Sequence, residues 1–143
     1  MNNEIQVKCG SWADLGQFAS AIRQQVFVIE QKIPAELEWD ERDALCLHAV
    51  AFNAAGEALG TGRLLPDSHI GRMAVLASAR GLGVGAALLQ ALLAAARARG
   101  DNSLRLHAQR DAAGFYEKAG FIVEGGSYLE AGIEHVTMQQ DLK

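Results

Sequence analysis

Apolar and polar positions repeat along this chain with two different periods. Residues 4–10 and 103–109 alternate from one position to the next, as in a strand with one buried face. Residues 11–31 instead place apolar side chains such as Leu15 and Ile22 at the spacing of one helix face. The pattern therefore predicts strands at the first two segments and a helix at the third.

The remaining elements follow from the same two periods, together with turn and cap residues. Strands are predicted at 46–53, 58–66, 69–76, 121–132 and 133–142, and helices at 83–99 and 111–120. The resulting order is β-α-β-β-β-α-β-α-β-β. Hairpins mixed with helical crossovers predict a single α/β domain over residues 1–143, in which helices cover a mixed sheet of the α+β type.

Composition and charge narrow the class of protein. Half of the 143 residues are hydrophobic and the formal net charge is −4, so no basic field draws the chain to nucleic acid or anionic lipid. The first residues lack the pattern of a signal peptide, and the longest apolar stretch, 83–96, is too short to cross a bilayer. Cys9 and Cys46 lie far apart, without metal-ligand spacing. We therefore expect a cytoplasmic protein with no metal, no nucleic-acid partner and no membrane partner.

The composition is most unusual where the strand at 69–76 gives way to the helix at 83–99. Every second residue from 81 to 85 is glycine, and residues 82–89 contain neither an acid nor a hydroxyl to cap the helix. The unpaired N–H groups of the first turn, the positive end of the helix dipole and the cation of Arg80 predict an anion-binding site. The alternative is a flexible loop before an ordinary amphipathic helix.

Two familiar phosphate-binding motifs fit this junction poorly. No Lys-Ser or Lys-Thr follows the glycines, which excludes a Walker motif. Gly81, Gly83 and Ala86 do satisfy the dinucleotide pattern G-x-G-x-x-G/A, but Leu106 and His107 stand near the point where that fold requires an acid. The chain after Ala86 is also too short for a second mononucleotide-binding half and a substrate domain.

Two stretches resemble motifs of the GNAT superfamily of N-acetyltransferases. The segment RGLGVGAALL matches that family's R/Q-x-x-G-x-G/A motif at Arg80, Gly83 and Gly85, and LHAQRDAAGFYEKAGF resembles its later strand and helix. The order of elements agrees over nearly the whole chain. The resemblance implies a GNAT-like acyl-CoA N-acyltransferase fold with a splayed central sheet, and acetyl-CoA as the co-substrate.

The resemblance also implies where acetyl-CoA binds. Backbone amides of the glycine turn would hold its pyrophosphate, at Arg80, Gly81, Leu82, Gly83, Val84, Gly85 and Ala86. The pantetheine arm would pair with the edge of the preceding strand at Met73, Ala74 and Val75, where a bulge and a gap leave ladder groups open. A backbone N–H near Ala74 or Val75 would polarise the thioester carbonyl.

Tyr116 takes the place of the tyrosine that this family carries on its later helix. A phenol with a pKa of about 10 is protonated at neutral pH, so it can give a proton to the departing thiolate of coenzyme A. We therefore expect Tyr116 to be the catalytic acid. The alternative is that Tyr116 only packs beside Phe115.

A general base is harder to assign. The candidates are Glu36, Glu38, Asp40 and Asp43 in the acidic connector 35–44, and His48 and His107 in predicted strands. The acids of the connector are as easily explained as part of a solvated surface as by a catalytic role. A single histidine in a strand is more often a structural residue than a base. His135 ranks lower, because hydrogen bonding within the sheet explains it better. A chain of water molecules is a further alternative to any single base.

These inferences predict an enzyme that moves the acetyl group of acetyl-CoA directly to a primary amine of a small molecule. The acidic connector favours a cationic acceptor. One alternative is a coenzyme A-binding domain that senses or regulates without turnover. Another is an adaptor that dimerises through its sheet edge, and a homodimer is compatible with each of these roles.

Overall fold

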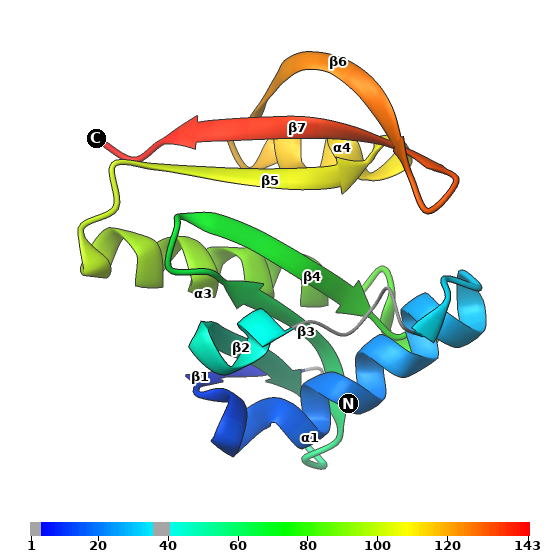
Figure 1. Cartoon of the computed structure of the whole chain (residues 1–143). Helices are drawn as coiled ribbons and strands as arrows, with labels where there is room; N and C mark the ends of the chain where they lie inside the picture. Colours follow the sequence, from blue (N-terminus) through cyan, green and yellow to red (C-terminus); the bar gives the residue numbers. More distant parts are fainter. Residues whose placement is uncertain (1–3, 36–40) are drawn as a thin grey trace.

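The computed structural model describes residues 4–35 and 41–143, which form a seven-stranded sheet with helices on both faces (Figure 1). The strand order is β1-β2-β3-β4-β5-β7-β6. Within these residues, β4 and β5 are the only neighbouring strands that run parallel. The predicted element order and the mixed α/β class are confirmed.

The elements agree with the predicted bounds to within a residue or two, apart from the first helix. The strands are β1 Gln6–Gly10, β2 Leu47–Phe52, β3 Ala58–Leu64, β4 His69–Val75, β5 Ser103–Gln109, β6 Ile122–Glu130 and β7 Ile133–Asp141. The α-helices are α1 Trp12–Arg23, α3 Val84–Arg99 and α4 Ala113–Lys118. Shorter helical turns are η1 Gln24–Glu30, η2 Glu41–Leu45, η3 Ala77–Ala79 and η4 Arg110–Ala112. None of the described helices is long and apolar enough to cross a bilayer.

The first helix departs from the single α-helix predicted over 11–31. Ser11 caps α1 as predicted, but α1 then changes into η1, which is a π-helix. The wider π turn brings the consecutive residues Val26 and Phe27 to the same cavity. The apolar spacing in the sequence does not reveal this change of pitch, because it depends on what the helix packs against.

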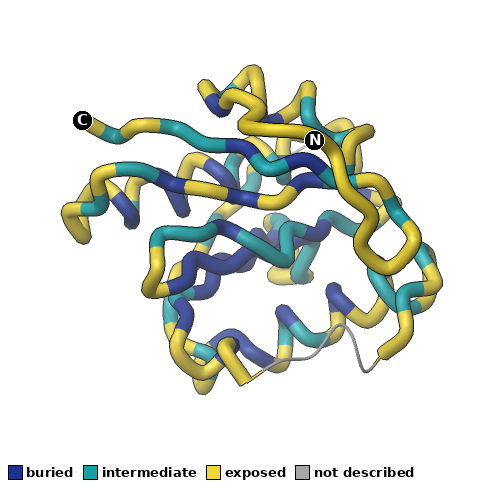
Figure 2. Tube along the Cα trace, turned by 45° about the horizontal axis from the view of Figure 1, so that its top comes forward, coloured by how far each residue is buried: buried dark blue, intermediate teal, exposed yellow. Residues whose placement is uncertain are grey.

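The core consists of two apolar layers, one on each face of the sheet (Figure 2). Alternate residues of β2 divide between them: Ala49 and Ala51 pack in the layer of α3, whereas Val50 and Phe52 pack in the layer of α1. The four leucines of α3 are all buried. The helical periods in the sequence therefore identified the correct core faces of both long helices.

β4 and β5 separate soon after they meet. Their ladder joins only His69 to Arg105 and Ile70 to Leu106, and beyond it the two strands diverge (Figure 1). β4 also carries a bulge against β3, where Arg72 has a φ of 50°, in the left-handed region. The splayed central sheet is therefore confirmed, and the far end of β4 has an unpaired edge beside β5.

Candidate active site

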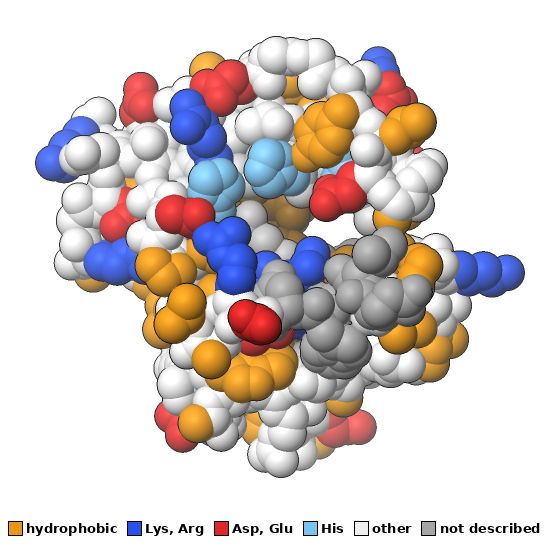
Figure 3. All heavy atoms as spheres, viewed as in Figure 1, with side chains coloured by type: hydrophobic (Ala, Val, Ile, Leu, Met, Phe, Trp, Pro, Cys, Tyr) orange, Lys and Arg blue, Asp and Glu red, His pale blue; other side chains and the backbone are white. Residues whose placement is uncertain are grey.

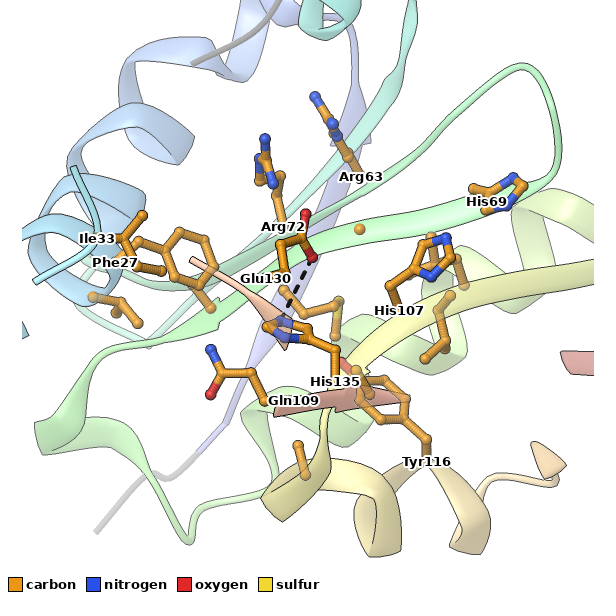
Figure 4. A pocket seen from close by; sticks show the side chains of 18 of the residues that line it. Phe27, Ile33, Arg63, His69, Arg72, His107, Gln109, Tyr116, Glu130 and His135 are labelled. Atoms are coloured by element: carbon orange, nitrogen blue, oxygen red, sulfur yellow. Dashed lines mark ion pairs between the residues drawn. The ribbon is translucent and has the colours of Figure 1, made fainter. Parts of the chain in front are cut away.

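A cavity of about 780 Å³ lies where the two halves of the sheet separate. Its walls come from β4 and β5, from η1 and from the turn that joins β6 to β7. Histidine and arginine side chains gather around the hollow on this face (Figure 3), and a close view labels the principal wall residues (Figure 4). A cavity of this volume is typical of sites for small molecules.

The turn before α3 has a backbone conformation that requires glycine. Gly81 and Gly83 both have a φ of 83°, which costs other L-residues about 1–2 kcal/mol. Nothing lies within 4 Å of the position that a Cβ would take on either glycine. No side chain of the described residues caps α3, and its first turn contains no acid. Within residues 4–35 and 41–143, the first N–H groups of this helix therefore have no competing side-chain partner.

The other residues of the predicted phosphate-binding turn differ in their surroundings. Leu82 and Ala86 are exposed, whereas Val84 is buried in the core. Gly85 packs against Phe115, because a Cβ at this position would lie 3.2 Å from its ring. Helix packing thus explains Gly85 as well as the approach of a ligand does.

Arg80, whose cation we expected to contribute to the anion site, is paired with an acid in this structure. Its Nη atoms donate to both carboxylate oxygens of Glu30 at 2.6 and 2.7 Å, and its Nε donates to the carbonyl of Val75 at 3.1 Å. The hydrogen bonds to Glu30 raise the pKa of Arg80, and the same contact lowers the pKa of Glu30. An anion that arrives at the turn therefore competes with Glu30 for the guanidinium group.

The open edge of β4 turns the backbone groups of Val75 toward the gap. Leu76 donates to the carbonyl of Leu59 on β3 at 2.9 Å. Successive residues of an antiparallel ladder alternate in direction, so Ala74 also faces β3 and Val75 faces away from it. The hydrogen bond from Arg80 to the Val75 carbonyl agrees with this direction. Of the two predicted oxyanion donors, Val75 has its N–H on the side of the gap.

Tyr116 lies on α4 and forms part of the cavity wall. It exposes only 8% of its surface, and its ring packs edge-to-face against Phe115 and Phe121, with centroids 5.0 and 6.2 Å away. Burial raises the pKa of the phenol to about 12. Tyr116 therefore packs against Phe115 and also borders the cavity. The sequence had left these two placements as alternatives.

Two of the candidate bases lie in a buried ion cluster and do not line the cavity. The carboxylate of Asp43 accepts hydrogen bonds from Arg23 at 2.9 and 3.1 Å and from Arg63 at 2.8 Å. Its backbone carbonyl lies 2.8 Å from Nε2 of His48, whose pKa burial lowers. This placement removes Asp43 and His48 from the candidates for a base that meets an acceptor in the cavity.

The remaining acids of the connector are placed only in part. Glu36, Glu38 and Asp40 lie outside the described residues, so their roles stay predictions. Within the described part of the connector, Glu41 is exposed and Asp43 belongs to the ion cluster. The described residues therefore supply no connector carboxylate to the cavity wall.

His107 does reach the cavity, as its predicted polar-facing position suggested. Its Nδ1 lies 2.8 Å from the hydroxyl of Tyr128 and 3.2 Å from that of Thr137. Its ring stacks on that of His69, with centroids 5.7 Å apart. Burial, followed by the nearby charge of His69, lowers the pKa of His107. Since each hydroxyl can donate or accept, either ring nitrogen of His107 can carry the proton.

Several cavity residues carried no signal in the sequence. They are Phe27, Gln31 and Ile33 in and after η1, Arg72 at the bulge and Glu130 at the end of β6. Their positions follow from the π turn, the bulge and the strand pairing, and none of these features leaves a local motif. Strand alternation does place Gln109 and His135 on the face of His107, because β5 and β7 pair Gln109 with His135.

Comparisons with known proteins agree with this geometry. The family model described as "Acetyltransferase (GNAT) domain" matches residues 20–142. An uncharacterized N-acetyltransferase of Bacillus subtilis is 37% identical over 124 residues, which cover 84% of this chain and 88% of that protein. The crystal structure of an acyl-CoA N-acyltransferase from Pseudomonas aeruginosa has a TM-score of 0.83 at 33% identity, covering 96% of this chain and 99% of that one. Escherichia coli ElaA has a TM-score of 0.85 at 26% identity, covering 96% and 100%. The chain therefore belongs to the GNAT superfamily of N-acetyltransferases.

Proposed function

We propose that this protein transfers the acetyl group of acetyl-CoA to a primary amine of a small molecule. The observation that carries the proposal is the start of α3, which contains no acid, is capped by no side chain of the described residues and follows two glycines with φ of 83°. A helix start of this kind binds phosphate oxygens through its N–H groups. The adjoining cavity of about 780 Å³ is in the range that accommodates a small acceptor.

The proposed acetyl-CoA site runs from the glycine turn to the edge of β4. Its diphosphate-binding part consists of Arg80, Gly81, Leu82, Gly83, Val84, Gly85 and Ala86. The pantetheine arm lies along Met73, Ala74 and Val75, where β5 has left the ladder. The N–H of Val75 then donates to the thioester carbonyl, and Arg80 exchanges Glu30 for a phosphate oxygen.

The proposed reaction is a direct transfer. The lone pair of a neutral amine attacks the thioester carbon and forms the C–N bond, while negative charge grows on the carbonyl oxygen beside the N–H of Val75. Collapse of this adduct breaks the C–S bond. The nitrogen gives a proton to a base, and the departing thiolate takes one from Tyr116, which recovers a proton from solvent. The products are an acetamide and the thiol of coenzyme A.

The pKa of Tyr116, about 12, determines when it can act. The phenol keeps its proton at neutral pH until a strong base forms beside it. A thiol in water has a pKa of about 8.5, so a solvated thiolate draws this proton poorly. Inside the cavity, however, desolvation raises the pKa of the thiol by the mechanism that raises that of Tyr116. The pKa values of the phenol and of the thiol are therefore closer to each other when the C–S bond breaks in a site that excludes water.

The proposal is tested by mixing the protein with acetyl-CoA and a panel of small primary amines, both cationic diamines and amines that carry a carboxylate. Release of thiol and appearance of the acetylated amine are measured together. Transfer to at least one amine supports the proposal. Binding of acetyl-CoA without acetylation of any amine would instead favour a sensor, and no heat on titration with acetyl-CoA would favour an adaptor.

A further inference from the structure

We propose that His135 is the general base for this reaction and that Glu130 is its positioning residue, an inference that rests on the acetyl transfer proposed above. Both residues line the cavity, His135 from β7 and Glu130 from the end of β6. Their side chains point toward each other across the cavity wall (Figure 4).

A backbone contact fixes the hydrogen on the ring of His135. Its Nδ1 lies 2.7 Å from the carbonyl oxygen of Ile133. Because a carbonyl oxygen can only accept, Nδ1 must donate, and in the neutral ring Nε2 holds the lone pair. This Nε2 lies 3.8 Å from a carboxylate oxygen of Glu130. The nitrogen that can take up a proton is therefore the one beside an acid on the cavity wall.

Packing holds the ring of His135 in this orientation. The residue pairs in register with Gln109 on β5 and with Tyr128 on β6. Its ring stacks on that of Tyr128, with centroids 5.9 Å apart and 26° between the planes. The side chain is 12% exposed, so it is shielded from solvent while it borders the cavity. A base held in this way meets the amine without having to be ordered first.

The proton transfer balances without a further reactant. As the C–N bond forms, one N–H bond of the amine breaks, its electron pair stays on nitrogen and the proton passes to Nε2 of His135. The ring then carries a positive charge, which the carboxylate of Glu130 stabilises. Glu130 has a side chain that is 61% exposed, so its effect is modest and the proton can leave to solvent beside it.

Position along the gap separates His135 from His69 of the same cavity. His69 has its Nδ1 within 3.2 Å of the Asp67 carbonyl, but it stands at the closed start of β4, about 20 Å of strand from Val75. His135 lies opposite Gln109, the last residue of β5, at the open end of the gap. That end also holds Val75, where the thioester is proposed to lie.

Charged and titratable groups that share the cavity wall with His135 or pack against it come from several elements. They include Glu130 and Tyr128 on β6, His107 on β5, His69 and Arg72 on β4, and Tyr116 on α4. His107 is the neighbour that a pH profile must separate from His135, since it too borders the cavity and lies on the adjacent strand.

The test compares pH profiles of kcat/KM for the wild type, His135→Gln and His107→Gln, corrected for ionisation of the amine itself. An imidazole accepts a proton only in its neutral form, so the wild-type rate should rise with pH to a plateau as the base becomes neutral. In His135→Gln this rise of kcat/KM with pH, the rising limb of the profile, should disappear. Its kcat should fall about 10²-fold, and its affinity for acetyl-CoA should not change. His107→Gln should keep the limb.

Two further variants keep the test independent of folding. Glu130→Gln changes an exposed residue and should lower kcat by up to about fivefold, because the charged ring loses a stabilising carboxylate. His135→Ala should regain part of its activity when imidazole is added. A limb and rate that survive in His135→Gln, or an unchanged kcat in Glu130→Gln, would overturn the inference while acetyl transfer stands. A wild type that binds acetyl-CoA but acetylates no amine would overturn the proposed function instead.

Discussion

The hydroxyl of Tyr116 is the atom on which the proposed protonation of coenzyme A depends. Tyr116→Phe removes that hydroxyl and keeps the ring that packs against Phe115 and Phe121. We expect kcat to fall roughly 10²-fold or more, with the affinity for acetyl-CoA nearly unchanged. Steady-state kinetics and calorimetry measure the two quantities. Tyr128→Phe, which alters the only other tyrosine of the sequence, should lower kcat less. Equal losses of kcat in the two variants would argue against Tyr116 as the catalytic acid.

The same hydroxyl makes the fold sensitive to alkali. Burial raises the pKa of Tyr116 to about 12 from the usual 10.0 of a phenol in water, so the native state keeps a proton that the unfolded chain has lost between these values. The contribution to stability is complete below about pH 10 and is lost as the pH rises through 12, by up to about 1.4 kcal/mol per pH unit.

Tyr116→Phe should therefore flatten the fall in the free energy of unfolding between pH 10 and 12. Denaturant titrations of wild type and variant at several pH values measure the two slopes. Parallel slopes would show that Tyr116 ionises in the native state as easily as in the unfolded chain.

Conformations and positions that are set by the local backbone were predictable from the sequence. The glycines at 81 and 83 and the tyrosine at 116 stand in short motifs, and their conformations or positions follow from those motifs. The pairing of Arg80 with Glu30 joins positions 50 apart, so no local pattern could show it. The contact between His135 and Glu130 depends on how β6 and β7 turn back on each other, which is again a property of the tertiary structure.

At the scale of elements, a buried ion cluster connects α1, η2 and β3. Asp43 of η2 binds Arg23 of α1 and Arg63 of β3, and all three residues are almost completely buried. Removing one charge from such a cluster leaves the others without full compensation. The acidic connector thus contributes to stability through Asp43. From the sequence, this residue could have been either part of a solvated surface or a catalytic base.

Asp43→Asn should lower the free energy of unfolding by about 3–5 kcal/mol. The matched control is Asp67→Asn, which breaks a 2.6 Å pair with Arg42 in which both side chains are about half exposed and which should cost no more than about 1 kcal/mol. Denaturant unfolding measures both. A variant Asp43→Asn that keeps its stability but loses kcat would restore Asp43 as a candidate base.

Helix and strand positions were predictable from hydrophobic period, whereas two irregular features were not. The π turn of η1 and the bulge at Arg72 each shift the chain by about one residue relative to a regular element. Such shifts change which side chains face the cavity, yet they leave the average apolar spacing almost intact. For this reason the sequence alone did not identify Phe27 and Arg72 as residues of the cavity wall.

At the scale of the whole molecule, the sheet is two halves that share a short parallel ladder between β4 and β5. Acetyl-CoA would complete that sheet by pairing with the open edge of β4. The amide of Val75 should therefore exchange its hydrogen quickly in the free protein and slowly once acetyl-CoA is bound. Ala74, which faces β3, provides the internal control, because its amide should be protected in both states.

Amide hydrogen exchange followed by NMR measures these two neighbouring residues in one experiment. Protection of Val75 on binding, with no change at Ala74, is the expected result. If Val75 stayed unprotected in the saturated complex, the pantetheine arm would have to bind elsewhere than along the edge of β4.

Acetyl-CoA binding in this proposal depends on the N–H groups at the start of α3, which hold its diphosphate. The most direct test is calorimetric titration of acetyl-CoA into Ala86→Glu and Ala94→Glu. Both substitutions place one carboxylate on an exposed position of α3, the first in its opening turn and the second two turns later. A carboxylate near the helix start also favours the helix dipole, so loss of fold does not account for a loss of binding in Ala86→Glu.

We predict that Ala86→Glu binds acetyl-CoA at least about tenfold more weakly than Ala94→Glu, since its charge repels the phosphates at close range. Equal affinities in the two variants would contradict the account.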